Sequence, residues 1–220
     1  MIASELIKLA YQEAMGESEP PTTGEENYKL LFNAANEFID TWQDEPGVDW
    51  EELQDTLSIT LTTDREYTPA VDAKFRRLAT GTLDGPYITT PAAQEVELKI
   101  AKPSQLGRTG NKVALVSGKV RLATTPSAAN GLVGGILSVP YIRWATKLTD
   151  GNSTIPVTNP MWLVYMVGWY FASQDYVKSN QAPRLAAMAK NEMESMKAEN
   201  INDEDDYITH GSLGIPTRTT

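Results

Sequence analysis

The pattern of apolar and polar positions divides the chain into three parts, with helical periodicity at both ends and alternation between them. In residues 1–55, apolar residues first recur at helical spacing after Ser4, which predicts a helix capped by Ser4. "TGEE" at Thr23–Glu26 has the spacing of a capping box and predicts the start of a second helix. One stripe of this second helix carries Leu31, Ala34, Ala35, Phe38 and Trp42.

Alternation begins near residue 56 and predicts an antiparallel β module over residues 56–158. Leu57, Ile59 and Leu61 alternate with polar residues, as in a half-buried strand. Turn signals rich in glycine separate the further candidate strands. Pro140 interrupts one run, which predicts an edge strand or a bulge there. The candidate strands are "LSITLT", "EVELKI", "KVALV", "KVRLAT", "GILSV" and "YIRWATKL".

Helical periodicity returns in residues 159–200, where "MWLVYMVGWYFA" at Met161–Ala172 contains no charged residue. A helix of this length covers about 18 Å, whereas a bilayer core is about 30 Å thick, so the segment is too short to span a membrane. A helix that is apolar on all sides must be covered on all sides. We therefore expect it at the centre of a bundle built from both ends of the chain. The expected core residues are Leu31, Phe38, Trp42, Trp162, Leu163, Met166, Trp169 and Tyr170.

A second C-terminal helix is predicted for residues 184–200, followed by a tail over residues 201–220. The tail combines an acidic run with glycine, proline and threonine, a composition that favours an extended chain. The sequence thus predicts an α+β fold. In this fold the N- and C-terminal helices form one bundle, an antiparallel β module is inserted into it, and an extended tail follows.

The formal charge of -10 is unevenly distributed along the chain. Residues 1–55 carry -12, residues 56–159 carry +5 and residues 160–220 carry -3. So acidic a surface repels phosphate, which argues against sequence-specific DNA binding and against anionic membranes. The chain has no cysteine, so disulfides and thiolate metal sites are excluded. The N-terminus lacks the pattern of a secretory signal, which predicts a soluble protein made in a cytoplasm.

For every candidate catalytic, cofactor or metal site in the sequence, an ordinary structural role explains the same residues better. His210, the single histidine, lies in the predicted tail, so a nucleophilic triad lacks a base. Glu95 and Glu97 point to one side of a strand, as a hydrolase acid pair would, but exposed strands commonly carry such acids. "DEDD" at Asp203–Asp206 lacks the glycine and the ligand spacing of a calcium loop. "KFRRL" at Lys74–Leu78 is expected to pair with acids internally or across a subunit contact.

Seven segments, in their order along the chain, carry a resemblance to a known family: "SELIKLAYQEAMG", "WQDEPGVDWEELQ", "ITLTTDREYTPAVDAKFRRL", "KPSQL", "VPYI", "IPVTNPMWLVYMVGWYFASQD" and "NQAPRLAAMAKNEMESMKAEN". Together they resemble the head-to-tail adaptor, or connector, proteins of tailed bacteriophages, of the helical-bundle type with a β insert. The resemblance covers residues 1 to about 200. It lies in the order and style of the segments, without an invariant motif.

The resemblance implies a structural virion protein of the head–tail neck, without enzymatic activity and assembled in the host cytoplasm. Such adaptors form a homo-oligomeric ring, usually of twelve copies, beneath the portal of the DNA-filled head. The ring extends the DNA channel, which DNA passes without sequence-specific binding, and supports a tail, nozzle or stopper protein. In this family the C-terminal segment often docks into the portal. The residues available for such docking here are Tyr207, Ile208, Leu213, Ile215 and Pro216.

Two other functions stay open from the sequence. One is a β-type binding module for glycan or protein on a helical stalk, which would use exposed aromatic residues. The other is a small hydrolase that uses Glu95 and Glu97. The candidate aromatic residues of the binding module are Tyr67, Tyr87, Tyr141 and Trp144.

Overall fold

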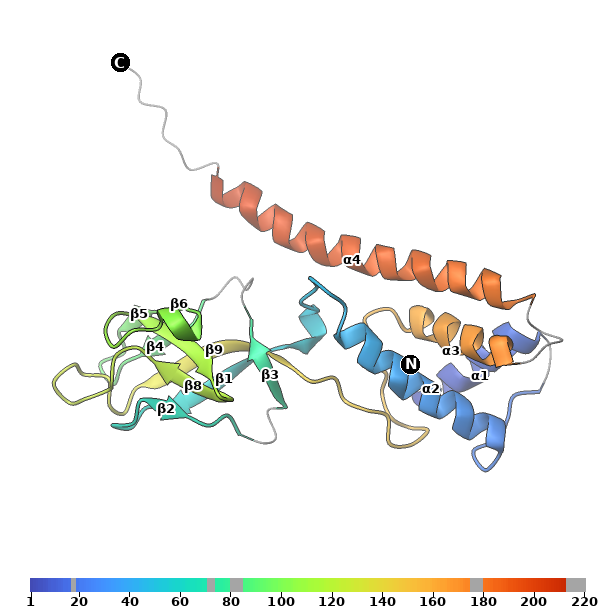
Figure 1. The fold of residues 1–220 in the computed structure, drawn as a ribbon, viewed down its shortest axis with the longest axis horizontal. Helices are drawn as coiled ribbons and strands as arrows, with labels where there is room; N and C mark the ends of the chain where they lie inside the picture. The colour runs from blue at the N-terminus through green and yellow to red at the C-terminus, as the bar shows by residue number, and fades with distance from the viewer. Residues whose placement is uncertain (17–18, 71–73, 80–84, 175–179, 213–220) are drawn as a thin grey trace, which may run out of the picture. The chain divides into compact units, whose positions relative to one another are not determined.

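A computed structural model describes residues 1–16, 19–70, 74–79, 85–174 and 180–212, with the side chains of 201–212 left out. The chain forms two compact units (Figure 1). The helical unit comprises Met1–Glu52 and Ala145–Thr220, and the β unit comprises Leu53–Trp144. The protein is therefore α+β, with strands inserted between two helical segments, as the sequence predicted.

The helical unit is built around α3, which contacts all three other helices (Figure 1). Gly168 of α3 allows a close contact with α1, because a Cβ placed on it would lie 3.0 Å from the carbonyl oxygen of Ala10. The helices are α1 (Ala3–Met15), α2 (Glu26–Gln43), α3 (Pro160–Gln174) and α4 (Ala182–Ser212), with a short 3₁₀ turn at Glu51–Leu53.

The segment after the β unit belongs to the helical unit and not, as predicted, to the β module. The amide of Ala145 donates to Gln43 Oε1 at 2.9 Å, and Leu148 exchanges hydrogen bonds with the Asn36 side chain. Leu148, Ile155 and Val157 are buried. The predicted insert boundary at 158 therefore lies too late, because "WATKL" reads as a strand in sequence yet pairs with side chains of α2.

The ends of the helices differ from the sequence prediction in two places. Neither Ser4 nor Thr23 caps a helix: α1 begins at Ala3 and α2 follows Glu25 without a side-chain capping bond. The helix predicted to end at residue 200 continues to Ser212, since no proline or glycine interrupts residues 184–210. Residues 201–212 of the predicted extended tail thus have helical backbone, and residues 213–220 lie outside the described residues.

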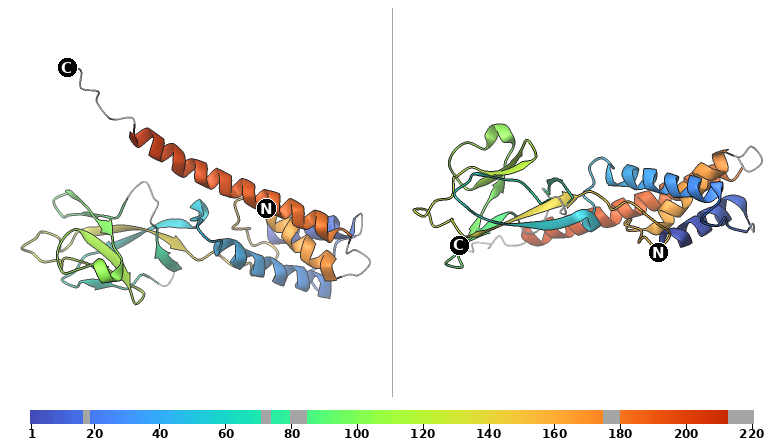
Figure 2. Two further views of the ribbon diagram at one scale, coloured as in Figure 1. Left: turned by 45° about the horizontal axis from the view of Figure 1, so that its top comes forward. Right: turned by 90° about the horizontal axis from the view of Figure 1, so that it is seen from below.

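Two sheets make up the β unit, as the further views in Figure 2 show. One has the order β1-β9-β4-β5, with β3 also paired to β9, and the other has the order β2-β8-β7-β6. One pair, β6 with β7, is parallel, so the module is not purely antiparallel as predicted. The strands are β1 (Gln54–Thr60), β2 (Glu66–Tyr67), β3 (Phe75–Leu78), β4 (Tyr87–Thr89), β5 (Glu95–Glu97), β6 (Lys99–Ile100), β7 (Lys112–Val116), β8 (Lys119–Leu122) and β9 (Ile136–Arg143).

β9 is the central strand of its sheet although it contains Pro140, which the sequence predicted for an edge or a bulge. On one side β9 pairs with β1 along its length, and Pro140 faces Thr56. On the other side β4 pairs with residues 136–138 and β3 with residues 141–143. The carbonyl of Pro140 accepts the amide of Ala79 on this side. The missing N–H therefore falls at the junction between two partner strands, where it interrupts neither ladder.

Both sheets contribute side chains to one apolar cluster, which forms the core of the β unit. Leu137, Val113 and Val120 are fully buried there. "EVELKI", predicted as one strand, is divided between the sheets, because β5 ends at Glu97 and β6 begins at Lys99. Leu98, between them, is buried in the shared cluster.

Candidate assembly surfaces

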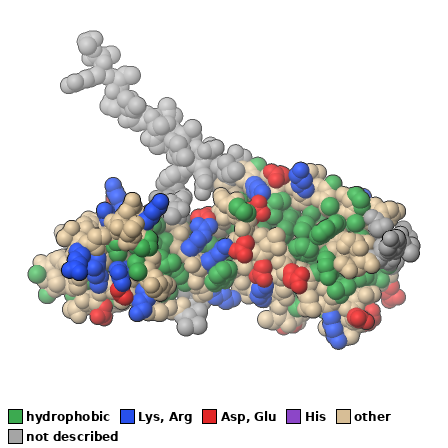
Figure 3. Space-filling model, viewed as in Figure 1, with side chains coloured by type: hydrophobic (Ala, Val, Ile, Leu, Met, Phe, Trp, Pro, Cys, Tyr) green, Lys and Arg blue, Asp and Glu red, His purple; other side chains and the backbone are tan. Residues whose placement is uncertain are grey.

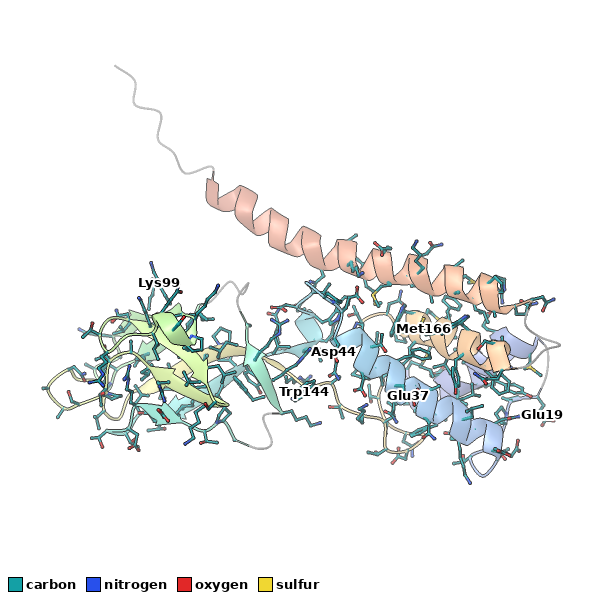
Figure 4. All side chains as sticks on the ribbon, in the orientation of Figure 1. Glu19, Glu37, Asp44, Lys99, Trp144 and Met166 are labelled. Atoms are coloured by element: carbon teal, nitrogen blue, oxygen red, sulfur yellow. The ribbon has the colours of Figure 1, made fainter. Side chains whose placement is uncertain are left out.

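Four apolar side chains of α2 and α3 form a half-buried surface, which we call the aromatic face: Phe38, Met166, Trp169 and Tyr170. The ring of Phe38 lies 6.2 Å from that of Trp169 and 6.3 Å from that of Tyr170, centre to centre. Met166 lies three and four positions before these two residues, so all three share one side of α3. Figure 3 shows hydrophobic side chains gathered on this part of the helical unit, and Figure 4 shows Met166 beside α2.

The prediction that α3 would be covered on all sides is wrong for the aromatic face. The side of α3 that contains Leu163, Val164 and Val167 is fully buried, whereas Met166, Trp169 and Tyr170 are only partly covered. The apolar period of α3 cannot indicate which side points outward, because every side is apolar. Partly exposed Trp, Tyr, Phe and Met are the residue types enriched at the centres of protein interfaces.

The other predicted core residues, Leu31, Trp42 and Trp162, are buried, as predicted. Trp42 stacks on Trp50 with ring centres 5.3 Å apart. The indole N–H of Trp50 donates to the carbonyl of Trp42 at 2.7 Å. Trp50 thus covers the C-terminal end of α2. Periodicity could not predict this role, because Trp50 precedes only a short 3₁₀ turn.

Polar side chains join α4 to α1 and to the start of α3, and their charges act on Tyr165 of α3. Arg184 donates to Glu13 at 2.8 Å, and Asn159 donates to Glu192 at 2.5 Å. Burial, followed by the charges of Glu13 and Glu192, raises the pKa of Tyr165 above its ordinary value of 10.0. The neutral phenol is therefore the favoured form in the folded helical unit.

A salt bridge between α4 and the end of α2 gives the helical unit a second shifted group. Lys197 donates to Glu45 at 2.5 Å. This hydrogen bond raises the pKa of Lys197 above its ordinary value of 10.5. The bridge ties α4 to the loop that follows α2.

α2 also carries an acidic stripe, Glu26 and Glu37, on its solvent side. The spacing of eleven residues brings the two back to one side of a helix with 3.6 residues per turn. Glu26 and Glu37 are exposed and form no ion pair within the described residues. Glu37 directly precedes Phe38, so the acidic stripe borders the aromatic face (Figure 4).

The outer face of the second sheet is basic. The register pairs Lys99 with Lys112 and Val116 with Lys119, so these lysines share the face opposite the buried Val113 and Val120. The loop over residues 102–110 packs on the same face through Leu106, which contacts Ala114 and Ala123. We call five exposed residues of this surface the basic face: Lys99, Lys102, Arg108, Lys112 and Lys119. Figure 3 shows Lys and Arg side chains gathered on this part of the β unit.

The basic face is not neutralised by acids of the β unit. In the part of the chain that the structure describes, none of its five residues forms an ion pair. The neighbouring Arg121 pairs with Glu66, so the one acid of the sheet on this side is already engaged. Lys99 and Lys112, which are direct neighbours in the sheet, place like charges opposite each other, an arrangement that lowers sheet stability.

A cavity of about 390 Å³ opens in the β unit beside Trp144, which is exposed. The guanidinium of Arg76 lies 4.8 Å from the centre of the Trp144 ring, within the range of a cation–π contact. Of the aromatic residues that the glycan-binding hypothesis required to be exposed, Tyr67 and Tyr141 are buried, and Tyr87 is half-buried. Only Trp144 meets that requirement.

The acidic candidates lie apart from this cavity. Glu95 and Glu97 are both exposed on β5, an end strand of the first sheet, and neither lines the cavity. Among the described residues, no three His, Asp or Glu side chains are grouped as metal ligands would be.

The predicted docking residues cannot be placed by their side chains. The backbone of Tyr207 and Ile208 lies in α4, but their side chains are not described. The acidic run 203–206 and His210 also have their backbone in α4, and their side chains are likewise not described. Leu213, Ile215 and Pro216 lie outside the described residues.

Comparison with protein-family models gives no match for this chain, and comparison with curated proteins gives none. Of the described helices, none combines the length and the apolar character that crossing a bilayer requires.

Proposed function

We propose that this protein is a structural subunit of a homo-oligomeric ring, the head–tail connector of a tailed bacteriophage. In this role about twelve copies sit beneath the portal, extend the DNA channel and support a tail, nozzle or stopper protein. The proposal takes its biological setting from the resemblance of the seven segments. Its physical support comes from the surfaces of the helical unit.

The observation that carries the proposal is the aromatic face. Phe38, Met166, Trp169 and Tyr170 lie together on the helical unit, and each is partly exposed. Contiguous apolar surface of this kind marks an interaction site. Trp and Tyr are also the residues that carry most of the binding energy at interfaces. A ring subunit requires such a surface on every copy.

The experiment that tests the proposal measures the size of the particle. Sedimentation velocity and negative-stain images of the protein, alone and mixed with the portal of the same virus, are expected to show rings. Trp169→Ala is expected to prevent ring formation while the helical content by circular dichroism stays unchanged. Trp144→Ala removes a tryptophan from the β unit and serves as the matched control, with rings expected. A parent protein that remains monomeric with and without the portal contradicts the proposal.

The C-terminal segment is proposed to attach the ring to the portal. Its apolar residues, spaced among polar ones, fit an element that folds against a groove on a partner. Each copy offers only a few apolar residues and binds weakly, whereas the ring binds tightly through many copies acting together. Deleting residues 201–220 is expected to leave the melting temperature unchanged and to abolish binding to DNA-filled heads. A truncated protein that still completes particles contradicts this assignment.

A second candidate function, a binding module in the β unit, is supported by the cavity beside Trp144. An exposed tryptophan with a neighbouring cation is suited to stacking on a sugar ring or a peptide side chain. A glycan or peptide array tests this candidate directly. Binding that Trp144→Ala removes, in a protein that does not form rings, would favour the module over the connector.

A further inference from the structure

The two units of the chain carry opposite net charge. Residues 53–144 contain eleven Lys or Arg and seven Asp or Glu, a net charge of +4. The remaining residues contain eight Lys or Arg and twenty-two Asp or Glu, a net charge of -14. Surfaces of opposite sign attract each other and orient an encounter between two molecules. Each copy of this protein therefore offers both halves of a complementary pair.

We infer that the basic face of one copy docks on the acidic stripe of α2 in a neighbouring copy, so that the contact is head-to-tail. This inference rests on the proposed function, because it assigns a partner surface within the proposed ring. A contact between two different surfaces repeats around a ring and closes it when the rotation fits. A contact of one surface with itself would instead stop at a dimer.

The spacings of the two charged surfaces agree. Glu26 and Glu37 are separated by eleven residues, which is about 16 Å along a helix. On the basic face, Lys119 lies opposite Val116, which is four residues after Lys112 along β7. The rows of Lys112 and Lys119 are therefore about 13 Å apart along the strand. Long lysine side chains cover the remaining few ångströms. The two rows of charge are thus of similar length.

The basic face also gives a reason to expect a partner. Lys99 and Lys112 repel each other in the free subunit, and no acid within the described residues relieves that repulsion. A carboxylate on the neighbouring copy would relieve it. The acidic stripe borders the aromatic face, so a contact with the stripe places charged pairs at the edge of that face.

The test reverses the charge on each side of the proposed contact. Lys99→Glu with Lys112→Glu is expected to weaken self-association of the full chain about tenfold or more, measured by sedimentation velocity at low salt. Glu26→Lys with Glu37→Lys is expected to do the same. The protein that carries all four changes is expected to recover most of the association. The control is Lys8→Glu with Lys190→Glu, at exposed positions on α1 and α4. It changes the net charge as Lys99→Glu with Lys112→Glu does, and it is expected to have little effect on association.

The outcomes separate this inference from the proposed function. A parent protein that does not associate under any condition overturns the proposed ring, and this contact with it. If the parent associates and the Lys99→Glu/Lys112→Glu protein associates equally well, the contact alone is overturned. A third outcome is that the parent binds duplex DNA, the variant does not, and association is unchanged. In that case nucleic acid occupies the basic face, and the inference is wrong.

Discussion

The helical unit and the β unit differ in where they keep their apolar and charged side chains. The β unit encloses its apolar residues between two sheets and presents uncompensated lysines on one outer face. The helical unit encloses one side of α3 and leaves the aromatic face partly uncovered beside an acidic stripe. The difference indicates two kinds of surface. One is suited to tight apolar contact, and the other to contacts guided by charge.

The largest expected effects come from two core substitutions, each of which lowers the stability of one unit only. Trp42→Ala removes a fully buried indole from the helical unit and is expected to lower its stability by about 3–5 kcal/mol. Leu137→Ala removes a fully buried side chain from the β unit, with an expected loss of about 2–5 kcal/mol. Calorimetry is expected to show two transitions, each lowered by one variant. Equal shifts of both transitions by either variant would mean that the units unfold together.

Two glycines test the packing within each unit and are expected to give the next largest effects. In Gly135→Ala the new Cβ would lie 2.8 Å from the carbonyl oxygen of Thr89 and 3.1 Å from that of Leu132, both in the β unit. In Gly168→Ala it would lie 3.0 Å from the carbonyl oxygen of Ala10 in the helical unit. Overpacking of this kind costs about 1–3 kcal/mol, and we expect the larger loss at Gly135.

The control for both glycines is Gly24→Ala, because no atom lies within 4 Å of its Cβ position. Thermal unfolding of the three variants is the measurement. Unchanged melting of the Gly168→Ala protein would show that α1 and α3 can separate without loss, contrary to the packing described here.

Alkaline pH is expected to weaken the helical unit through Tyr165 and Lys197. The pKa of each is raised in the folded protein above the ordinary values of 10.0 and 10.5. A raised folded pKa gives stability that is present below the unfolded pKa and is lost as pH rises through the folded pKa. Melting of the helical unit should therefore fall from about pH 10 upward. Tyr165→Phe is expected to reduce that fall, and a fall of equal size in this variant would assign the effect to other groups.

The smallest expected effect concerns the two acids of β5. Glu95→Gln with Glu97→Gln changes exposed side chains only, so stability should change by no more than about 0.5 kcal/mol. Ring formation and the infectivity of assembled particles are expected to remain normal. Particles that assemble normally and fail to infect would revive the hydrolase hypothesis and give the β unit a chemical role.

The sequence predicted the elements of the helical unit better than their packing. The stripe through Leu31 and Trp42 has a clear helical period, and both residues are buried. Phe38 was predicted on the same stripe but is half-buried. The period of α3 could not distinguish Trp169, which is half-buried, from Leu163, which is fully buried. The orientation of an all-apolar helix depends on which distant parts of the sequence pack against it. Periodicity within the helix carries no information about those partners.

In the β unit the sequence predicted strands but not their assignment to sheets. Alternation through Val96, Leu98 and Ile100 is continuous, although the chain changes sheet at Leu98. Pro140 indicated an edge strand or a bulge. It lies in the central strand, at a junction that only tertiary pairing creates, and the register shift falls in the partner strand β3, between Phe75 and Arg77. The basic face was likewise not predicted. It requires the register that places Lys99 beside Lys112, which are thirteen positions apart in the sequence.

The pairing of β1 with β9 has a consequence for how this gene can change. The chain enters the β unit through β1 and leaves through β9, and Gln54 lies opposite Ile142. Opposite residues of antiparallel strands are only about 5 Å apart. The two ends of the insert are therefore about as close together as the two ends of a hairpin turn. A gene that replaces codons 53–144 with a two-residue Asn-Gly turn would leave the ends of the helical segments as close as before. The β unit can thus be acquired, discarded or exchanged as one cassette in a single recombination event, while the helices keep their contacts.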